Sequence, residues 1–195
     1  PINPIGNLNR KGSLGSYYSV KDYRAINPEY GTMADFKRLV EKAHSLGMYV
    51  IVDWVANHTA WDNAWVLEHP EWYTRDQNGN ITPPVADWSD VADLNYNDAN
   101  LRKEMIECMK YWVKEANIDG YRCDVAWGVE QRSTTFWRNM TKRLKNINPE
   151  FFLLAEASML AEPEKNDGIP AGEDGHSIIF EDRYTAAYDW ELRGF

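Results

Sequence analysis

Three acidic residues each follow a short apolar run of the chain. Asp53 follows residues 48–52, Asp124 follows residues 118–123, and Glu156 follows residues 151–155. If these runs are parallel strands, their carboxyl ends open on one face of the fold, so the three carboxylates converge there. Converging carboxylates can hold a metal ion, pair with arginines, or act as nucleophile and general acid. A single acidic residue at a strand end is more often a helix cap or a surface residue, so the recurrence carries the prediction.

An arginine accompanies the second of these carboxylates. Arg122 and Asp124 are two residues apart, so on a strand both side chains point to the same face. The arginine is expected to keep Asp124 ionised and oriented, which suits a nucleophile. Glu156 follows a fully apolar strand, and partial desolvation would favour its protonated form, which suits a proton donor. This division of labour is typical of retaining glycoside hydrolysis.

Periodicity predicts the elements that position these residues. Thr32 and Asp35 have the spacing of a capping box, so a helix begins near Met33, and Gly47 suits the position after its end. Further helices are predicted over residues 99–116 and 134–145, with Ser133 as a candidate cap for the second. Apolar runs predict buried strands at residues 48–52, 118–125 and 151–155, with a fourth ending near residues 188–190.

Alternation of helices with buried strands predicts an α/β fold with a parallel sheet. Residues 59–98 interrupt this alternation and are too long for an ordinary connection. They contain the turn sequence Asp76-Gln77-Asn78-Gly79 and the pair Pro83-Pro84, so we predict a small inserted subdomain. The predicted organisation is therefore residues 1–58, an insertion at 59–98, and residues 99–195.

Composition excludes several classes of protein. Of the 195 residues, 21 are Lys or Arg and 30 are Asp or Glu, a net charge of −9, so the chain lacks the basic character that binds nucleic acid or anionic membranes. It has no apolar run long enough to span a bilayer. Cys108 and Cys123 are too few for a disulfide scaffold or a four-cysteine zinc site, and each is expected to be a free buried thiol.

The two ends of the sequence predict a fragment of a longer protein. The first six residues include no initiator Met and no features of a signal peptide, and the last six do not taper into a polar tail. The cellular location therefore stays open.

Three segments resemble the α-amylase family, glycoside hydrolase family thirteen. They are Asp53-Trp54-Val55-Ala56-Asn57-His58, Gly120-Tyr121-Arg122-Cys123-Asp124-Val125, and Glu156. They match three of the family's four motifs in order. Residues 18–32 resemble the segment between the second and third barrel strands, and Asp93-Leu94-Asn95 resembles a motif near the end of the family's domain B.

The resemblance implies a partial TIM (β/α)₈ barrel, about strands three to six, with domain B inserted. It implies that Asp124 is the nucleophile, Glu156 the general acid/base, and Arg122 the residue that orients Asp124. His58 is implied to contact a sugar hydroxyl and Tyr18 to form a stacking platform beneath the sugar. Asp53 is implied to have a structural role, bonded to Arg122.

Departures from the family pattern limit what the resemblance implies. The fourth motif and several barrel strands are missing. After Asp124 the chain reads Val125-Ala126-Trp127-Gly128, without the Lys-His pair that in starch-degrading members contributes to a sugar subsite and a calcium site. Asn57 remains a candidate calcium ligand, although no cofactor is expected to be required. The segment that begins at Asp76 resembles half a calcium loop, but an Asn-Gly hairpin turn is the simpler interpretation.

Several functions fit these motifs. The leading expectation is retaining hydrolysis of α-glucosidic bonds in starch-like glucans or malto-oligosaccharides by the parent enzyme. A transglycosylase and an α-1,6-specific glucosidase share the motifs, and a non-catalytic relative that serves as a binding or transporter-associated subunit is a further alternative. The isolated chain is expected to be inactive and to self-associate, because a half barrel leaves two sheet edges open.

Overall fold

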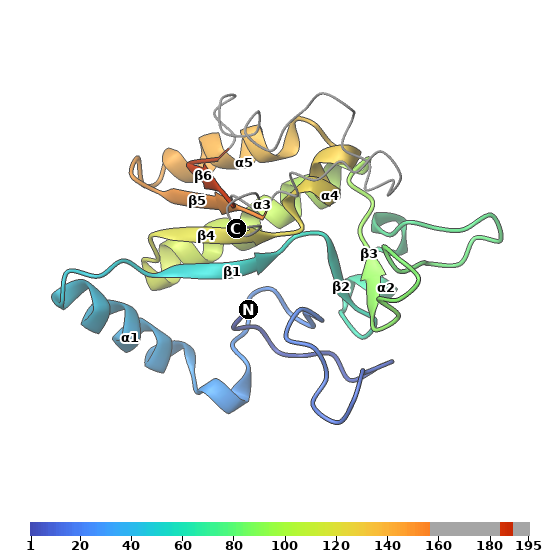
Figure 1. Ribbon diagram of the computed structural model, residues 1–195, viewed down its shortest axis with the longest axis horizontal. Helices are drawn as coiled ribbons and strands as arrows, with labels where there is room; N and C mark the ends of the chain where they lie inside the picture. The colour runs from blue at the N-terminus through green and yellow to red at the C-terminus, as the bar shows by residue number, and fades with distance from the viewer. Residues whose placement is uncertain (157–183, 189–195) are drawn as a thin grey trace, which may run out of the picture.

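The computed structural model describes residues 1–156 and 184–188 of the chain (Figure 1). In chain order its elements are η1 (Pro28–Tyr30), α1 (Met33–Ser45), β1 (Ile51–Val55), β2 (His58–Ala60), α2 (Trp65–Glu68), η2 (Pro70–Trp72), β3 (Val91–Asp93), α3 (Ala99–Ala116), β4 (Gly120–Asp124), α4 (Ala126–Arg132), α5 (Phe136–Lys145), β5 (Phe152–Ala155) and β6 (Ala186–Ala187). Within these ranges, no helix has the length and apolar character needed to cross a membrane.

The main sheet has four parallel strands in the order β1-β4-β5-β6. The α/β prediction and the parallel pairing are therefore confirmed, with β1 and β6 as the outer strands. Strand β4 pairs with β1 from Ile51 opposite Gly120 to Val55 opposite Asp124. This register places Asp53 opposite Arg122, and it aligns the carboxyl ends of the strands at one edge of the sheet.

The two faces of the sheet differ in character. On one face Trp54, Tyr121 and Cys123 are buried. Figure 1 shows α3 and α5 packed along the sheet. The opposite face carries Asp53 and Arg122, which are only half-buried. The alternation follows from the two-residue period of a strand. It leaves polar side chains on the face that would be the interior of a barrel.

Helix α3 anchors the apolar side and has the predicted bounds. Asp98 caps it by accepting hydrogen bonds from two backbone N–H groups, and Asn117 ends it in the left-handed conformation. The indole of Trp112 donates to the carbonyl of Tyr23 at 2.7 Å, which ties the helix to the N-terminal segment. The carbonyl of Met109 accepts a hydrogen bond of 2.7 Å from Tyr121, so the helix is fixed to β4.

Helix α1 also begins as predicted. Thr32 and Asp35 form the capping box, and Gly47 has a φ of +73° just after the helix. Its apolar residues are only partly covered, because Leu39 and Leu46 are exposed.

The first strand begins later than the apolar run suggests. Met48 and Tyr49 are exposed, and β1 starts only at Ile51, where pairing with β4 begins. The carboxylate of Asp119 accepts a hydrogen bond of 2.7 Å from the backbone N–H of Val50. This side-chain bond holds the residues just before β1, which are not part of the strand. Asp53 consequently lies inside β1 and not after it. The prediction of a strand at residues 48–52 buried on both faces is wrong in its bounds.

The segment after β4 also differs from the prediction. The strand predicted over residues 118–125 is shorter, Gly120–Asp124, and a short helix, α4, for which no element was predicted, begins after Val125. Ser133 ends α4 by donating its backbone N–H to Val129 and does not cap the next helix through its side chain. The last predicted strand corresponds to β6, which ends at Ala187, and residues 189–190 of the predicted end lie outside the described residues.

The predicted insertion contains its own small sheet, which Figure 1 shows beside the main sheet. Strands β2 and β3 pair antiparallel, with His58 opposite Asp93. Gly79 has a φ of +85°, and the Asp76 carboxylate accepts the backbone N–H groups of Asn78 and Asn80 at 2.8 and 2.9 Å. These bonds form a hairpin turn. The division of the chain at residues 58 and 98 remains a prediction, as does self-association of the isolated chain.

Candidate active site

A single guanidinium joins the three predicted carboxylates. Nη1 of Arg122 lies 2.9 Å from Oδ1 of Asp53 and 2.6 Å from Oδ1 of Asp124, and Nη2 lies 3.0 Å from Oε1 of Glu156. Nε of Arg122 donates to the hydroxyl of Tyr188 at 3.1 Å. Burial alone would lower the pKa of Arg122, but the bonds to Asp53 and Asp124 raise it above its ordinary value. The arginine is therefore a permanent cation at the carboxyl ends of β1, β4 and β5.

The backbone after Asp124 adopts an unusual conformation. Val125 has a φ of +46°, in the left-handed region that β-branched residues rarely occupy. In this conformation its N–H donates to Oε2 of Glu156 at 2.9 Å. The carbonyl of Glu156 in turn accepts the N–H of Ala126 at 3.2 Å. Strain of this kind is often found at functional sites, and here it joins the end of β4 to the residue after β5.

The charge balance differs from the one expected from the sequence. Burial, followed by the negative charge of Glu156, raises the pKa of Asp124 from 3.8 to about 7, although Arg122 opposes this rise. Glu156 accepts hydrogen bonds from Arg122 and Val125. Near neutral pH, part of Asp124 is therefore protonated in the free protein. The prediction that Arg122 keeps Asp124 ionised did not take this burial into account.

The raised pKa of Asp124 predicts a pH-dependent effect of Asp124→Asn on stability. An Asp whose pKa rises on folding destabilises the native state above its unfolded value of 3.8, and this loss is complete above about pH 7. The Asn variant has no such charge. We therefore expect the melting temperature of the variant minus that of wild type to be larger at pH 8 than at pH 5. The change corresponds to about 1–4 kcal/mol in the free energy of unfolding. Thermal unfolding of both proteins at the two pH values measures this, and an unchanged difference would contradict the assignment.

Two further predicted residues lie at the same edge. The hydroxyl of Tyr18 donates to Oδ2 of Asp53 at 3.2 Å, and its ring is partly exposed. His58 is buried, and its Nδ1 lies 3.1 Å from Nδ2 of Asn57. Burial, followed by the positive charge of Arg132, lowers the pKa of His58 to about 3. His58 is therefore neutral at physiological pH and can donate a hydrogen bond from one ring nitrogen while the other accepts.

These side chains surround a cavity of about 410 Å³. Its apolar walls include two indoles, and the ring of Trp88 lies 5.7 Å from that of His58. Flat aromatic rings beside charged and hydroxyl groups suit a ligand with both apolar faces and many hydroxyls. The lining residues used below are Tyr18, His58, Trp88, Asp124, Trp127 and Glu156.

Three predicted site residues do not line this cavity. Asp53 and Arg122 contact residues that line it, whereas Asn57 lines an adjoining cavity of about 250 Å³. The two cavities share Trp88, Val125 and Trp127. Oδ1 of Asn57 accepts a hydrogen bond from Nη2 of Arg132. Among the described residues, no three His, Cys, Asp or Glu side chains cluster in a way that could hold a metal ion.

Sequence reasoning missed several contributors to the site. Tyr188 lies far in sequence from Arg122, and Arg132 lies far from Asn57 and Asp93, so no local pattern indicates these contacts. Trp88 of the insertion lines both cavities, and no sequence pattern singled it out. The sequence does not predict the left-handed backbone at Val125, because β-branched residues normally avoid that conformation.

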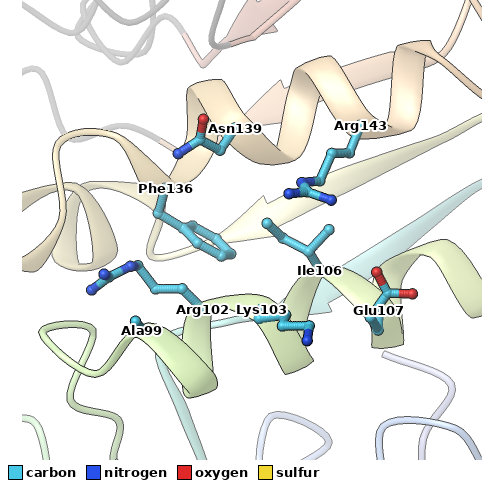
Figure 2. Close-up of a pocket in the computed structure, with 8 residues that line it drawn as sticks. All are labelled: Ala99, Arg102, Lys103, Ile106, Glu107, Phe136, Asn139 and Arg143. Atoms are coloured by element: carbon cyan, nitrogen blue, oxygen red, sulfur yellow. The ribbon is translucent and has the colours of Figure 1, made fainter.

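Another cavity lies on the helix side of the molecule. Figure 2 shows Arg102, Lys103 and Arg143 around a hollow between α3 and α5, with Glu107 at one end. It has a volume of about 230 Å³ and shares no lining residue with the carboxylate cavity. None of the predicted site residues lines it, so the candidate active site is the cavity at the strand ends.

Comparison with known proteins agrees with this placement. The α-amylase catalytic domain family matches residues 10–181. A crystal structure of an α-amylase from Lactobacillus plantarum is 43% identical, with a TM-score of 0.87, over 100% of this chain and 44% of that chain. Alpha-amylase 3 of Dictyoglomus thermophilum is 31% identical over 162 residues, which is 71% of this chain and 32% of the relative.

A transferase is also among the relatives. The α-1,4-glucan:maltose-1-phosphate maltosyltransferase of Arcanobacterium haemolyticum is 33% identical over 177 residues, which is 80% of this chain and 25% of the relative. The chain thus spans a third or less of the length of these two curated relatives. The solved structure confirms the prediction of a partial barrel fold. Because the family match covers most of the sequence, the chain belongs to the α-amylase family.

Proposed function

We propose that the full-length protein cleaves α-glucosidic bonds in α-glucans such as starch or malto-oligosaccharides, with retention at the anomeric carbon. One observation carries the proposal: the terminal nitrogens of Arg122 bind both Asp124 and Glu156 at the edge of one cavity. Two carboxyl groups close together on either side of a sugar are what retaining hydrolysis requires. Membership of the α-amylase family and the 43% identity to an α-amylase support the substrate class.

The first chemical step uses both carboxyl groups. A carboxylate oxygen of Asp124 attacks the anomeric carbon, and the bond from that carbon to the glycosidic oxygen breaks as Glu156 gives that oxygen its proton. In the second step Glu156 takes a proton from water, whose oxygen attacks the same carbon and releases Asp124. The reaction requires that Asp124 and Glu156 together hold one proton, and that Asp124 is negatively charged when it attacks.

In the free protein, burial favours a proton on the opposite carboxyl. With a pKa of about 7, Asp124 is partly protonated near neutral pH, and Glu156 accepts hydrogen bonds from Arg122 and Val125. We propose that substrate entry transfers the proton to Glu156, because the glycosidic oxygen becomes the partner of Glu156 and Arg122 remains with Asp124. Coupled carboxyl groups share protons in this way, so the total count matters more than the resting position.

The surrounding residues bind and orient the sugar. The Tyr18 ring offers a stacking face, and its bond to Asp53 holds it beside the carboxylates. Neutral His58 can donate to a sugar hydroxyl. Asp53 fixes Arg122 from the far side and has a structural role. Trp88 and Trp127 provide apolar walls along the cavity, where further sugar units would bind.

A second candidate function is transfer of the glycosyl group to another sugar. The 33% identity to a maltosyltransferase favours including it. Transfer shares the first step, and differs only in whether water or a sugar hydroxyl attacks the glycosyl-enzyme.

Product analysis separates these candidates. The full-length protein is incubated with a malto-oligosaccharide, and proton NMR follows the anomeric signals during the first minutes. Hydrolysis with retention is expected to yield the α-anomer first, whereas transfer would lengthen part of the oligosaccharide pool. Initial formation of the β-anomer would contradict the proposed mechanism.

A further inference from the structure

Four oxygen atoms from three separate elements converge on one arginine. Nε of Arg132 donates to the carbonyl of Gly128 at 2.8 Å, and Nη1 donates to the carbonyl of Leu94 at 2.8 Å. Nη1 also binds Oδ1 of Asp93, and Nη2 binds Oδ1 of Asn57. Asn57 follows β1, Asp93 and Leu94 end the inserted segment's sheet, and Gly128 lies in α4. The guanidinium therefore connects the insertion to the main sheet.

The chemistry of these oxygens is that of a hard cation site. One carboxylate, one amide and two backbone carbonyls form a donor set that Ca²⁺ would accept. Asn57 is 1% exposed and Asp93 6% exposed, so both are buried. Yet each of the four oxygens already accepts a hydrogen bond from Arg132. The positive charge of Arg132 also compensates the negative charge of Asp93. A metal ion and the guanidinium cannot share the same oxygens at bonding distance, so the residues present do not fit a calcium ion.

We propose that Arg132 takes the place of a metal ion as the cation that fastens the insertion to the sheet and positions His58. Only the kinetic part of this inference rests on the proposed function. Arginine suits the task because its planar fork presents several donors in fixed directions. Its place in the last turn of α4 adds a favourable interaction with the helix dipole.

The positioning of His58 follows from how Asn57 is held. Arg132 occupies Oδ1 of Asn57, so the NH₂ group of Asn57 faces His58, where it donates to Nδ1 at 3.1 Å. Nδ1 is thus the acceptor, and Nε2 carries the ring proton. The charge of Arg132 also helps to keep His58 neutral. Arg132 is therefore a positioning residue that acts on the cavity through Asn57.

Gly128 makes this close arrangement feasible. A Cβ atom at this position would lie 2.7 Å from Oδ1 of Asn57, closer than real contacts allow. A side chain here would therefore displace the amide that links Arg132 to His58.

Thermal unfolding of the full-length protein tests the inference without measuring activity. We expect EDTA to leave the wild-type melting temperature unchanged. Arg132→Ala is expected to lower it by about 5 °C or more, because Asp93 loses its buried partner. Millimolar Ca²⁺, or guanidinium at concentrations too low to denature, should restore much of this loss in the variant and have no such effect on wild type.

Arg143→Ala is the matched control, since Arg143 is exposed on α5 and lies outside the site. It should show neither the loss nor the rescue. The inference is overturned if EDTA lowers the wild-type melting temperature and Ca²⁺ restores it, or if Arg132→Ala behaves like Arg143→Ala. If Arg132→Ala does not fold, the EDTA result on wild type still decides, and Arg132→Lys should fold with intermediate stability.

Two further readouts separate positioning from general stability. Arg132→Lys should raise KM for a malto-oligosaccharide about tenfold with a smaller change in kcat, because His58 binds substrate. In Arg132→Lys, nitrogen NMR should show that the Nε2-protonated form of His58 is no longer the dominant species. An unchanged His58 spectrum in the folded variant would overturn the positioning role.

Discussion

Replacing Asp124 with Asn is expected to lower kcat for a malto-oligosaccharide by about 10⁴-fold or more. The amide retains the shape of the side chain and can still accept a hydrogen bond from Arg122. It cannot act as a nucleophile at the anomeric carbon, so no glycosyl-enzyme forms. Steady-state kinetics of the full-length protein measure the loss, with correct folding checked by thermal unfolding.

Asp119→Asn is the matched control for this substitution. Asp119 lies just before the same strand, at its opposite end, and binds His44 and Val50. Its substitution is expected to cost stability and to leave kcat within about threefold. An equal loss of kcat in both variants would attribute the effect of Asp124→Asn to folding and would remove the support for a nucleophile.

Glu156→Gln is expected to have an effect that depends on the leaving group. For a polysaccharide, whose leaving oxygen needs a proton, the first step should slow by about 10²–10⁴-fold. A glycosyl fluoride needs little protonation, so its first step should be nearly unaffected, and loss of the general base should make the second step limiting. Kinetics with both substrates measure the difference.

The exposed residue Glu150, just before β5, provides the control variant Glu150→Gln. It should leave the rates on both substrates unchanged. If Glu156→Gln slowed formation of the glycosyl-enzyme from the fluoride as severely as cleavage of the polysaccharide, Glu156 would not be the acid.

Local patterns predicted the elements whose signals lie within a few residues of each other. The apolar spacing of residues 99–116 predicted α3 with the bounds that the structure has, and the capping box at Thr32 marks the start of α1. The start of β1 could not be predicted in this way. The apolar run begins at Met48, but pairing with β4 and the bond from Val50 to Asp119 decide where the strand begins.

The site was predictable where strand order alone brings residues together. Asp53, Arg122 and Asp124 meet because β1 and β4 are parallel neighbours in register. The charge state of Asp124 was not predictable, since its burial depends on how the strands and α4 enclose it. The role of Arg132 depends on three oxygens from distant parts of the sequence, those of Asn57, Asp93 and Leu94, so the sequence near Arg132 does not indicate it.

Trapping the glycosyl-enzyme tests the central assignment most directly. In Glu156→Gln, a maltosyl fluoride should still react with the nucleophile, while removal of the sugar by water is slow, so the intermediate accumulates. Proteolysis and tandem mass spectrometry then locate the added maltosyl mass. We predict that it is attached to the side chain of Asp124. An adduct on any other residue, or release of β-maltose with no adduct, would contradict a retaining mechanism through Asp124.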